Sequence, residues 1–465
     1  MHTIVSTANT IWNRMRGAVI GAGALVVLIS LVRWGGVARP GPLFVAGVAL
    51  LSGIIFAFGL LVWWLFLSPM ANASYRAVPR SAESRQIVAI LVVLSGMLYV
   101  IGLFWDEVWH RRYGGFGNDF LWPPHMLLYG SLGLIAVFAV GGLLLVLRAS
   151  GDIRQRFRSD PLVGLLGLMA AFQVASLPSD QLWHQIYGLD LTAWSLPHLL
   201  LISGSTLVFL AAIGMQLSLV PPGPWRGLRG LRLPELLTLV LITWAAVILV
   251  QLGTTEWEGI TEIGRGDSAF SRAFWARPEW LYPVVVISIA SFVGNLAVHA
   301  LRRAGVATLV GLAVLGFRLG GIAVASDVGL GVVAQVLLLP PLLALDGWYA
   351  ARREHAAELR TLLGGNLLAG AVFLLVGLPL IAALMVYPRV NGATLPGMIG
   401  MSLLMAHAAG WTGARLGGWL GGIERQANVQ ARPSARVSWI AAGALAAAVA
   451  FLLVFVLTAR PPTAL

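Results

Sequence analysis

Long runs of apolar residues recur along the entire chain, and no other feature of the sequence restricts the fold as strongly. A helix that crosses a membrane needs about 20 mostly apolar residues. About thirteen such runs follow one another in the 465 residues, starting near Gly17, Pro42, Gln86, Leu121, Pro161, Trp194, Leu233, Glu279, Gly305, Gly329, Asn366, Ala393 and Val437. Only 11% of the residues are charged, against about 25% in a soluble domain. We therefore expect an all-α, polytopic transmembrane helical bundle.

Arginines gather in short segments between the runs, and their placement predicts the orientation of the chain. The stretches 148–158, 226–232, 351–360 and 415–436 are rich in arginine, and such segments stay on the cytoplasmic side. With thirteen spans, the N-terminus then lies inside and the C-terminus outside, in what we expect to be a bacterial cytoplasmic membrane. The net charge of +12 is placed to meet anionic lipid headgroups. The lipid bilayer is therefore the expected partner, and nucleic acid is not.

The chain has no cysteine, which restricts the cofactors that it can hold. Iron–sulfur clusters, thiolate-bound zinc, blue-copper sites and covalently attached haem all need that side chain. Histidine, aspartate, glutamate and methionine remain as candidate metal ligands.

One arrangement of polar residues occurs twice, as DEVWHRRYGGFGNDFLWPPH at 106–125 and as DQLWHQIYGLDLTAWSLPH at 180–198. In each copy an aspartate precedes a histidine by four residues, which places both on one face of a helix. A second histidine follows a proline that opens the next span. The sequence thus predicts a parallel internal repeat of helical hairpins. Each hairpin would hold one carboxylate and two imidazoles at its extracytoplasmic end: Asp106, His110 and His125 in the first, and Asp180, His184 and His198 in the second.

Aromatic and acidic residues recur in the same order around these candidate ligands. We expect them to lie around the ligands, orienting them and limiting water: Trp109, Tyr113, Asp119 and Trp122 in the first copy, and Trp183, Tyr187, Asp190 and Trp194 in the second. An interfacial aromatic belt with simple Asp–His hydrogen bonds would leave a similar pattern. Metal binding is the interpretation that we adopt, because six ionisable groups recurring in register so near hydrocarbon are costly.

The type of metal is less constrained than its ligands. A thiol-free set of one carboxylate and two imidazoles suits copper, zinc or non-haem iron. The residues alone do not choose among these three metals.

The spacing of the two triads resembles the metal-binding motif of the C subunit of copper membrane monooxygenases, the family of the particulate methane and ammonia monooxygenases. The resemblance covers residues 86–220. It implies that Asp106, His110 and His125 match the first copper site of that family, and that the triad led by Asp180 matches the second. Asp180 stands where the family typically has asparagine, and the first triad has a slightly longer gap before its last histidine.

These features divide the chain into three expected parts. Residues 1–85 form an N-terminal two-span segment, residues 86–220 a duplicated metal-binding four-helix unit, and residues 221–465 a C-terminal helical membrane region of unassigned role. The resemblance implies a copper-dependent monooxygenase that hydroxylates a small apolar substrate with dioxygen at the extracytoplasmic side, reduced by a separate electron donor. The alternatives are a metal-handling or proton-coupled transporter and a structural subunit of a larger membrane complex.

Overall fold

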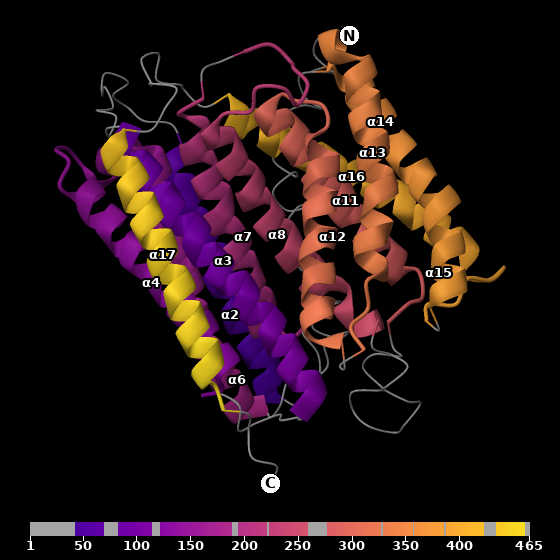
Figure 1. The fold of residues 1–465 in the computed structure, drawn as a ribbon, viewed down its shortest axis with the longest axis horizontal. Coiled ribbons are helices and arrows are strands. Elements are labelled where there is room, and N and C mark those ends of the chain that lie inside the picture. Colours follow the sequence, from indigo (N-terminus) through magenta and orange to yellow (C-terminus); the bar gives the residue numbers. More distant parts are fainter. Residues whose placement is uncertain are drawn as a thin grey trace, which may run out of the picture.

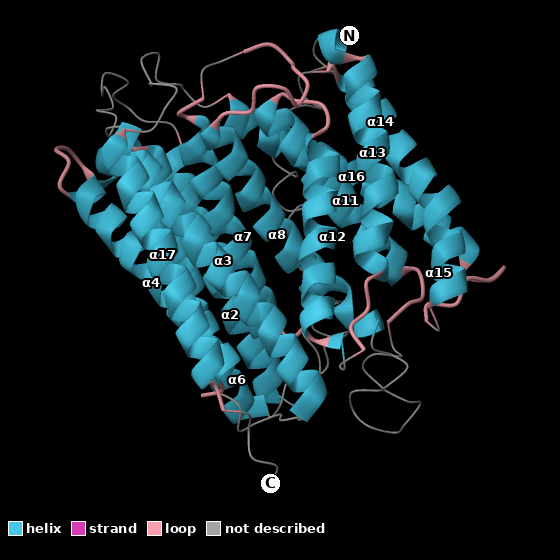
Figure 2. Cartoon of the chain, viewed as in Figure 1, coloured by secondary structure: helices cyan, strands magenta, loops and turns pink. Residues whose placement is uncertain are grey.

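The computed structural model describes residues 42–68, 82–113, 121–187, 194–220, 223–258, 277–326, 329–356, 358–385, 387–422 and 434–460, and within these ranges the chain is helical apart from short connections (Figures 1 and 2). The helices are α2 (Pro42–Val62), α3 (Ala82–Tyr113), α4 (Pro123–Leu147), α5 (Ile153–Ser159), α6 (Pro161–Tyr187), α7 (Leu196–Leu217), α8 (Leu233–Glu258), α11 (Leu281–Leu301), α12 (Val306–Val324), α13 (Val333–Ala351), α14 (Leu359–Val372), α15 (Leu378–Leu384), α16 (Leu395–Gly421) and α17 (Ala435–Thr458). A π-helical turn, Phe373–Gly377, joins α14 to α15. The described residues contain no β-strand, so the predicted all-α class is confirmed for them.

Ten helices of the described residues are long and apolar enough to cross a membrane, which makes the chain an integral membrane protein. They are α3, α4, α6, α7, α8, α11, α12, α13, the continuous α14–α15 and α17. A shorter apolar helix covers Ser52–Phe66, and the run near Gly17 lies outside the described residues. The number thirteen stays a prediction.

The long helices lie side by side and form two groups that meet at α8 (Figure 1). One group contains α3, α4, α6 and α7, which contact one another, and α17 packs on α3. The other group contains α11 to α16, and its most extensive contact joins α11 to α16. Since α8 contacts α3 and α7 as well as α11, α12 and α13, it connects the two groups. The part of the chain expected to bind metal is therefore packed against the C-terminal region.

Small residues explain the close approach of α11 and α16. Gly413, Gly417 and Gly421 follow one another at four-residue spacing on α16, and a Cβ atom on any of them would meet the backbone of α11. Small residues at this spacing let helix backbones touch inside a membrane.

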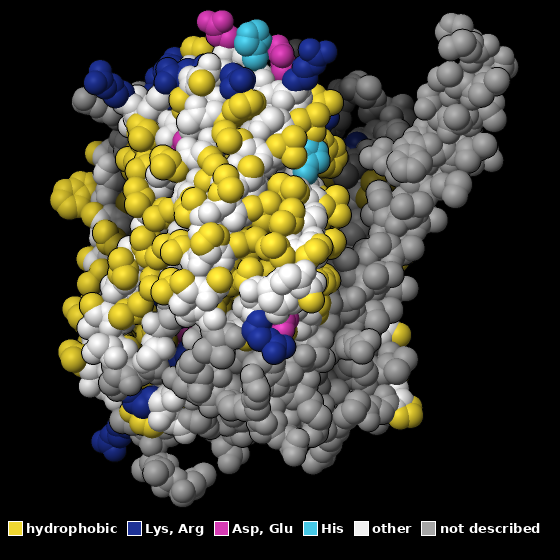
Figure 3. All heavy atoms as spheres, turned by 90° about the vertical axis from the view of Figure 1, so that its right-hand side faces the viewer, with side chains coloured by type: hydrophobic (Ala, Val, Ile, Leu, Met, Phe, Trp, Pro, Cys, Tyr) yellow, Lys and Arg dark blue, Asp and Glu magenta, His cyan; other side chains and the backbone are white. Residues whose placement is uncertain are grey.

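Arginine is concentrated at one end of the bundle, called the basic end here, where α4, α11 and α13 finish and α8 begins. Arg303 forms a buried pair with Glu235 there, with its Nε 2.6 Å from Oε1, and it also donates to the carbonyl oxygens of Gly227 and Arg229. Figure 3 shows charged side chains at the top of one face and hydrophobic side chains over the broad band beneath. The opposite end of the bundle, where α3 finishes and α4 begins, is called the metal end.

Candidate metal centre

The first triad is assembled by the end of α3 and the start of α4. Asp106 and His110 lie one turn apart on α3, so both side chains leave the same face of that helix. Trp122 is extended (φ −60°, ψ 144°) and caps α4, which has proline in its first turn. Proline suits this position because its fixed φ is helical and its missing N–H is not needed there. His125 consequently enters α4 within its first turn, beside the end of α3.

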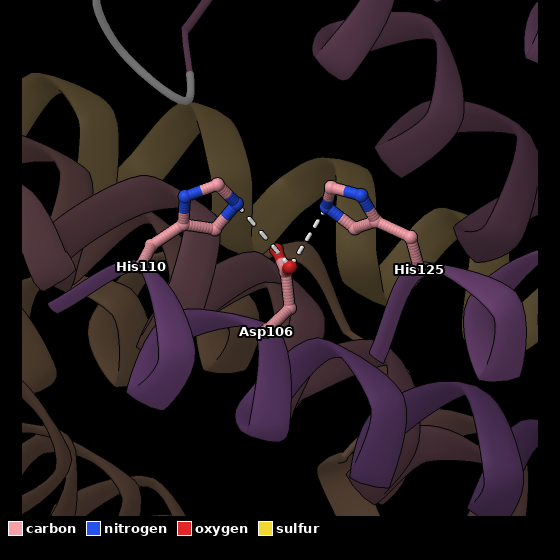
Figure 4. Close-up of side chains that lie close together, drawn as sticks. All are labelled: Asp106, His110 and His125. Carbon is pink, nitrogen blue, oxygen red and sulfur yellow. Dashed lines mark ion pairs between the residues drawn. The ribbon is translucent and has the colours of Figure 1, made fainter. Parts of the chain in front are cut away.

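Asp106 lies between the two histidines (Figure 4). Its Oδ1 is 3.3 Å from Nε2 of His110 and 2.8 Å from Nε2 of His125. One ligand atom from each of the three residues falls within 4.8 Å of the others. The three side chains are partly buried, with exposed fractions of 15% to 21%. The expected convergence of Asp106, His110 and His125 is therefore present.

These distances fit a metal ion. Imidazole nitrogens and carboxylate oxygens bind ions such as zinc at about 2.0–2.2 Å, which places neighbouring donor atoms about 3 Å apart. The two oxygen–nitrogen separations at Asp106 lie close to that value. Small side-chain rotations would bring all three donors onto one ion. In the structure, the same atoms approach one another as ion pairs between Asp106 and each imidazole.

Aromatic rings support both imidazoles of the first triad. The Trp122 ring lies 5.5 Å from the ring of His110, and Trp109 packs edge-on against Trp122 at 5.7 Å and Tyr113 at 5.5 Å. Trp109 is buried and Tyr113 is exposed. Tyr129, one turn after His125, has its ring 6.0 Å from that imidazole. Tyr129 was not among the residues predicted from the sequence, although its four-residue spacing from His125 could have indicated it.

The second hairpin is described only in part. Asp180 on α6 and His198 in the first turn of α7 approach each other, with 3.7 Å between Oδ1 and Nε2. His184 and Tyr187 belong to α6, but their side chains are outside the described part of the chain, as are Asp119 and Asp190 altogether. A second triad therefore stays a prediction, and so does the internal repeat.

The two tryptophans expected near the second triad are both buried. Trp183 lies on α6, one residue before His184. The indole of Trp194 donates to the carbonyl oxygen of Leu252 on α8 at 3.0 Å. Its ring also packs against Trp257 and under the guanidinium of Arg277. Trp194 thus ties the start of α7 to α8.

A second polar cluster lies on the other side of α3 and was not found from the sequence. Glu107 is paired with Arg318 of α12, and Gln251 of α8 also donates to Glu107. Arg318 falls within the apolar run that starts near Gly305. An arginine inside a span usually has a specific partner, and this signal could have indicated the cluster.

No family model, curated protein or solved structure matches this chain.

Proposed function

We propose that the chain is a membrane-embedded copper-binding protein with a centre formed by Asp106, His110 and His125. The observation that carries this proposal is the convergence of one carboxylate and two imidazoles within 4.8 Å at the metal end of the bundle. Placing two histidines and a carboxylate within a span costs free energy, unless a common partner offsets that cost. A metal ion is such a partner for all three side chains.

Copper is favoured over zinc and iron for two reasons. Divalent copper stands highest in the general affinity order for nitrogen and oxygen ligands. The spacing of the triad also resembles that of the copper membrane monooxygenases. Iron or zinc in the same ligands is an outcome that metal analysis would reveal.

The finer proposal is an oxygenase that acts on a small apolar substrate. Copper held by imidazoles supplies the capacity to bind and activate dioxygen. Trp122 and Tyr129 would orient the two imidazoles, and Trp109 would limit water behind Trp122. Leu121 and Met126 flank the centre and are 71% and 48% exposed, so an apolar molecule dissolved in lipid could approach this end of α4. The electrons would come from a separate donor protein.

The proposed orientation places the centre on the extracytoplasmic side, since the opposite, basic end fits the cytoplasmic side. The second hairpin is proposed as a second copper site. The Asp180–His198 approach supports this, because it corresponds to the Asp106–His125 approach in the first hairpin.

The test is metal analysis of the purified full chain in detergent, with and without added Cu(II). We expect near-stoichiometric copper that survives washing and an EPR spectrum with nitrogen hyperfine structure. His110→Ala and His125→Ala should each lose the copper of the first centre. His355→Ala is the matched control, because His355 is 63% exposed and pairs only with Glu358 among the contacts described for it. Wild-type protein that binds no metal, or equal loss in all three variants, would refute the proposal.

A metal-handling transporter is the second candidate, favoured by the buried charges of Glu107 and Arg318 within the spans. Reconstitution into vesicles separates the two functions. Transport predicts weakly held, exchangeable metal and measurable flux, whereas an oxygenase predicts retained copper without flux.

A further inference from the structure

A buried ion pair holds the back of α3, directly beside the candidate ligands. Arg318 of α12 binds Glu107 with two hydrogen bonds, of 2.5 Å from Nη1 to Oε2 and 3.0 Å from Nη2 to Oε1. The exposed fractions of the two side chains are only 4% and 11%. Such a two-point contact fixes direction as well as distance, because the guanidinium and the carboxylate are both planar.

Further contacts extend the pair to neighbouring helices. Gln251 of α8 donates to Glu107 Oε2 at 3.2 Å and to the carbonyl oxygen of Leu103 at 3.0 Å. Arg318 also donates from Nε to the carbonyl oxygen of Gly331, just before α13, at 2.7 Å. The carboxylate of Glu107 is thereby held by side chains of α8 and α12. Its partner on α12, Arg318, is in turn anchored to the segment before α13.

The same cluster also binds Arg111, one turn further along α3. Its Nε lies 3.2 Å from Glu107 Oε1, and its Nη2 donates to the carbonyl oxygen of Thr255 on α8 at 3.2 Å. Asp106 with His110, and Glu107 with Arg111, are thus consecutive pairs at four-residue spacing on α3. One residue advances a helix by about 100°, so the two pairs occupy different faces of the same turns.

This arrangement links the rotation of α3 to the metal centre. If α3 turned about its axis, Asp106 and His110 would swing away from His125, which belongs to α4. The contacts of Glu107 with α8 and α12 oppose that rotation. An ion pair buried in a membrane protein is costly to break, because one charge is left without its partner.

We propose that Glu107 and Arg318 are positioning residues for the metal centre, and that through them the helices after α7 hold Asp106 and His110 toward His125. The inference rests on the proposed metal-binding function. It gives a role to the C-terminal region, which the sequence left unassigned.

The test measures copper affinity and the EPR spectrum of Glu107→Gln and Arg318→Gln in the purified full chain. Positioning predicts that both variants lower the affinity, by about 10-fold to 100-fold as for other groups that orient metal ligands, and that both alter the nitrogen hyperfine pattern. A purely electrostatic effect predicts that the two variants change the copper affinity in opposite directions. Removing the negative charge would then weaken binding of a cation, removing the positive charge would strengthen it, and the spectrum would stay unchanged.

The chain offers a matched control in another buried pair, Glu235 with Arg303 at the basic end. Glu235→Gln and Arg303→Gln should lower the melting temperature but leave the copper spectrum unchanged. If either Glu107→Gln or Arg318→Gln fails to fold, Arg318→Lys replaces it. That variant keeps the charge without the two-point contact, and a smaller loss of affinity with an altered spectrum is expected.

Three results would overturn the inference. They are unchanged affinity and spectrum in the variants of the first pair, opposite shifts in affinity, and equal spectral changes in the control pair. Each would leave the proposed copper site standing, provided that the wild type binds copper and His125→Ala does not. Wild-type protein without copper would instead refute the proposed function, and the inference with it.

Discussion

Asp106 and Glu107 are neighbours in the chain, yet their carboxylates bind partners on different faces of α3. Oδ1 of Asp106 lies 2.8 Å from Nε2 of His125 on α4, whereas Oε2 of Glu107 lies 2.5 Å from Nη1 of Arg318 on α12. A rotation of about 100° between consecutive helical residues is enough to separate the two environments. The last turns of α3 therefore join the candidate metal centre to the C-terminal half of the bundle.

The aromatic ring of Trp122 should contribute to copper binding in a way that an aliphatic side chain cannot replace. It lies 5.5 Å from the His110 ring, so Trp122→Leu removes a flat surface against which the imidazole rests. We expect copper affinity to fall by about 10-fold, as for other groups that orient a ligand, with a changed EPR spectrum. Trp439→Leu on α17, where the side chain is 78% exposed, is the control and should bind copper as the wild type does. Identical copper affinities in the two variants would contradict the proposed role of Trp122.

Variants of the second hairpin should show whether it forms a separate site. If Asp180 and His198 hold their own copper, His198→Ala removes only that ion, and the protein keeps the copper and the spectrum of the first centre. Copper quantification beside EPR of this variant, of His125→Ala and of the double variant checks the expectation. Additive losses indicate two independent sites. Loss of all copper in either single variant would instead indicate one shared centre.

The absence of cysteine allows the orientation of α4 to be measured directly. Leu121 and Ser150 are both exposed and lie just beyond opposite ends of this helix. In intact cells, a membrane-impermeant maleimide should label Leu121→Cys, and it should label Ser150→Cys only after the membrane is opened. The unmodified chain gives the background. The reverse pattern would place the metal centre on the cytoplasmic side and would overturn the proposed orientation.

The sequence predicted the first triad because the features that build it are local. Four-residue spacing brings Asp106 and His110 together, and a proline near the helix start places His125 in the first turn of α4. The pair of Glu107 and Arg318 could not be predicted in this way, because 211 residues separate its members. Only the packing of α3, α8 and α12 brings them together.

Trp194 illustrates the same limit. Its place in the repeat corresponds to that of Trp122, but its hydrogen bond to Leu252 and its contact with Arg277 depend on where α8 and the segment before α11 lie. The apolar runs, by contrast, predicted the all-helical fold well, because a run of about 20 apolar residues in lipid can satisfy its backbone hydrogen bonds within a single helix. The number of spans is harder to predict, since short or glycine-rich helices differ little from the rest.

The packing of α16 on α11 should require glycine on the face of α16 that contacts α11, but not on the face that points away from it. A Cβ at Gly413 would meet the carbonyl of Phe292, whereas a Cβ at Gly418 would have no atom within 4 Å. Because the backbone of α11 cannot yield as a side chain can, Gly413→Ala should destabilise the protein by about 1–3 kcal/mol. Gly418→Ala should be neutral or stabilise it by up to about 1 kcal/mol, since alanine favours helix. Thermal unfolding of both variants in detergent measures the difference, and equal melting temperatures would show that the two helices pack less closely than described.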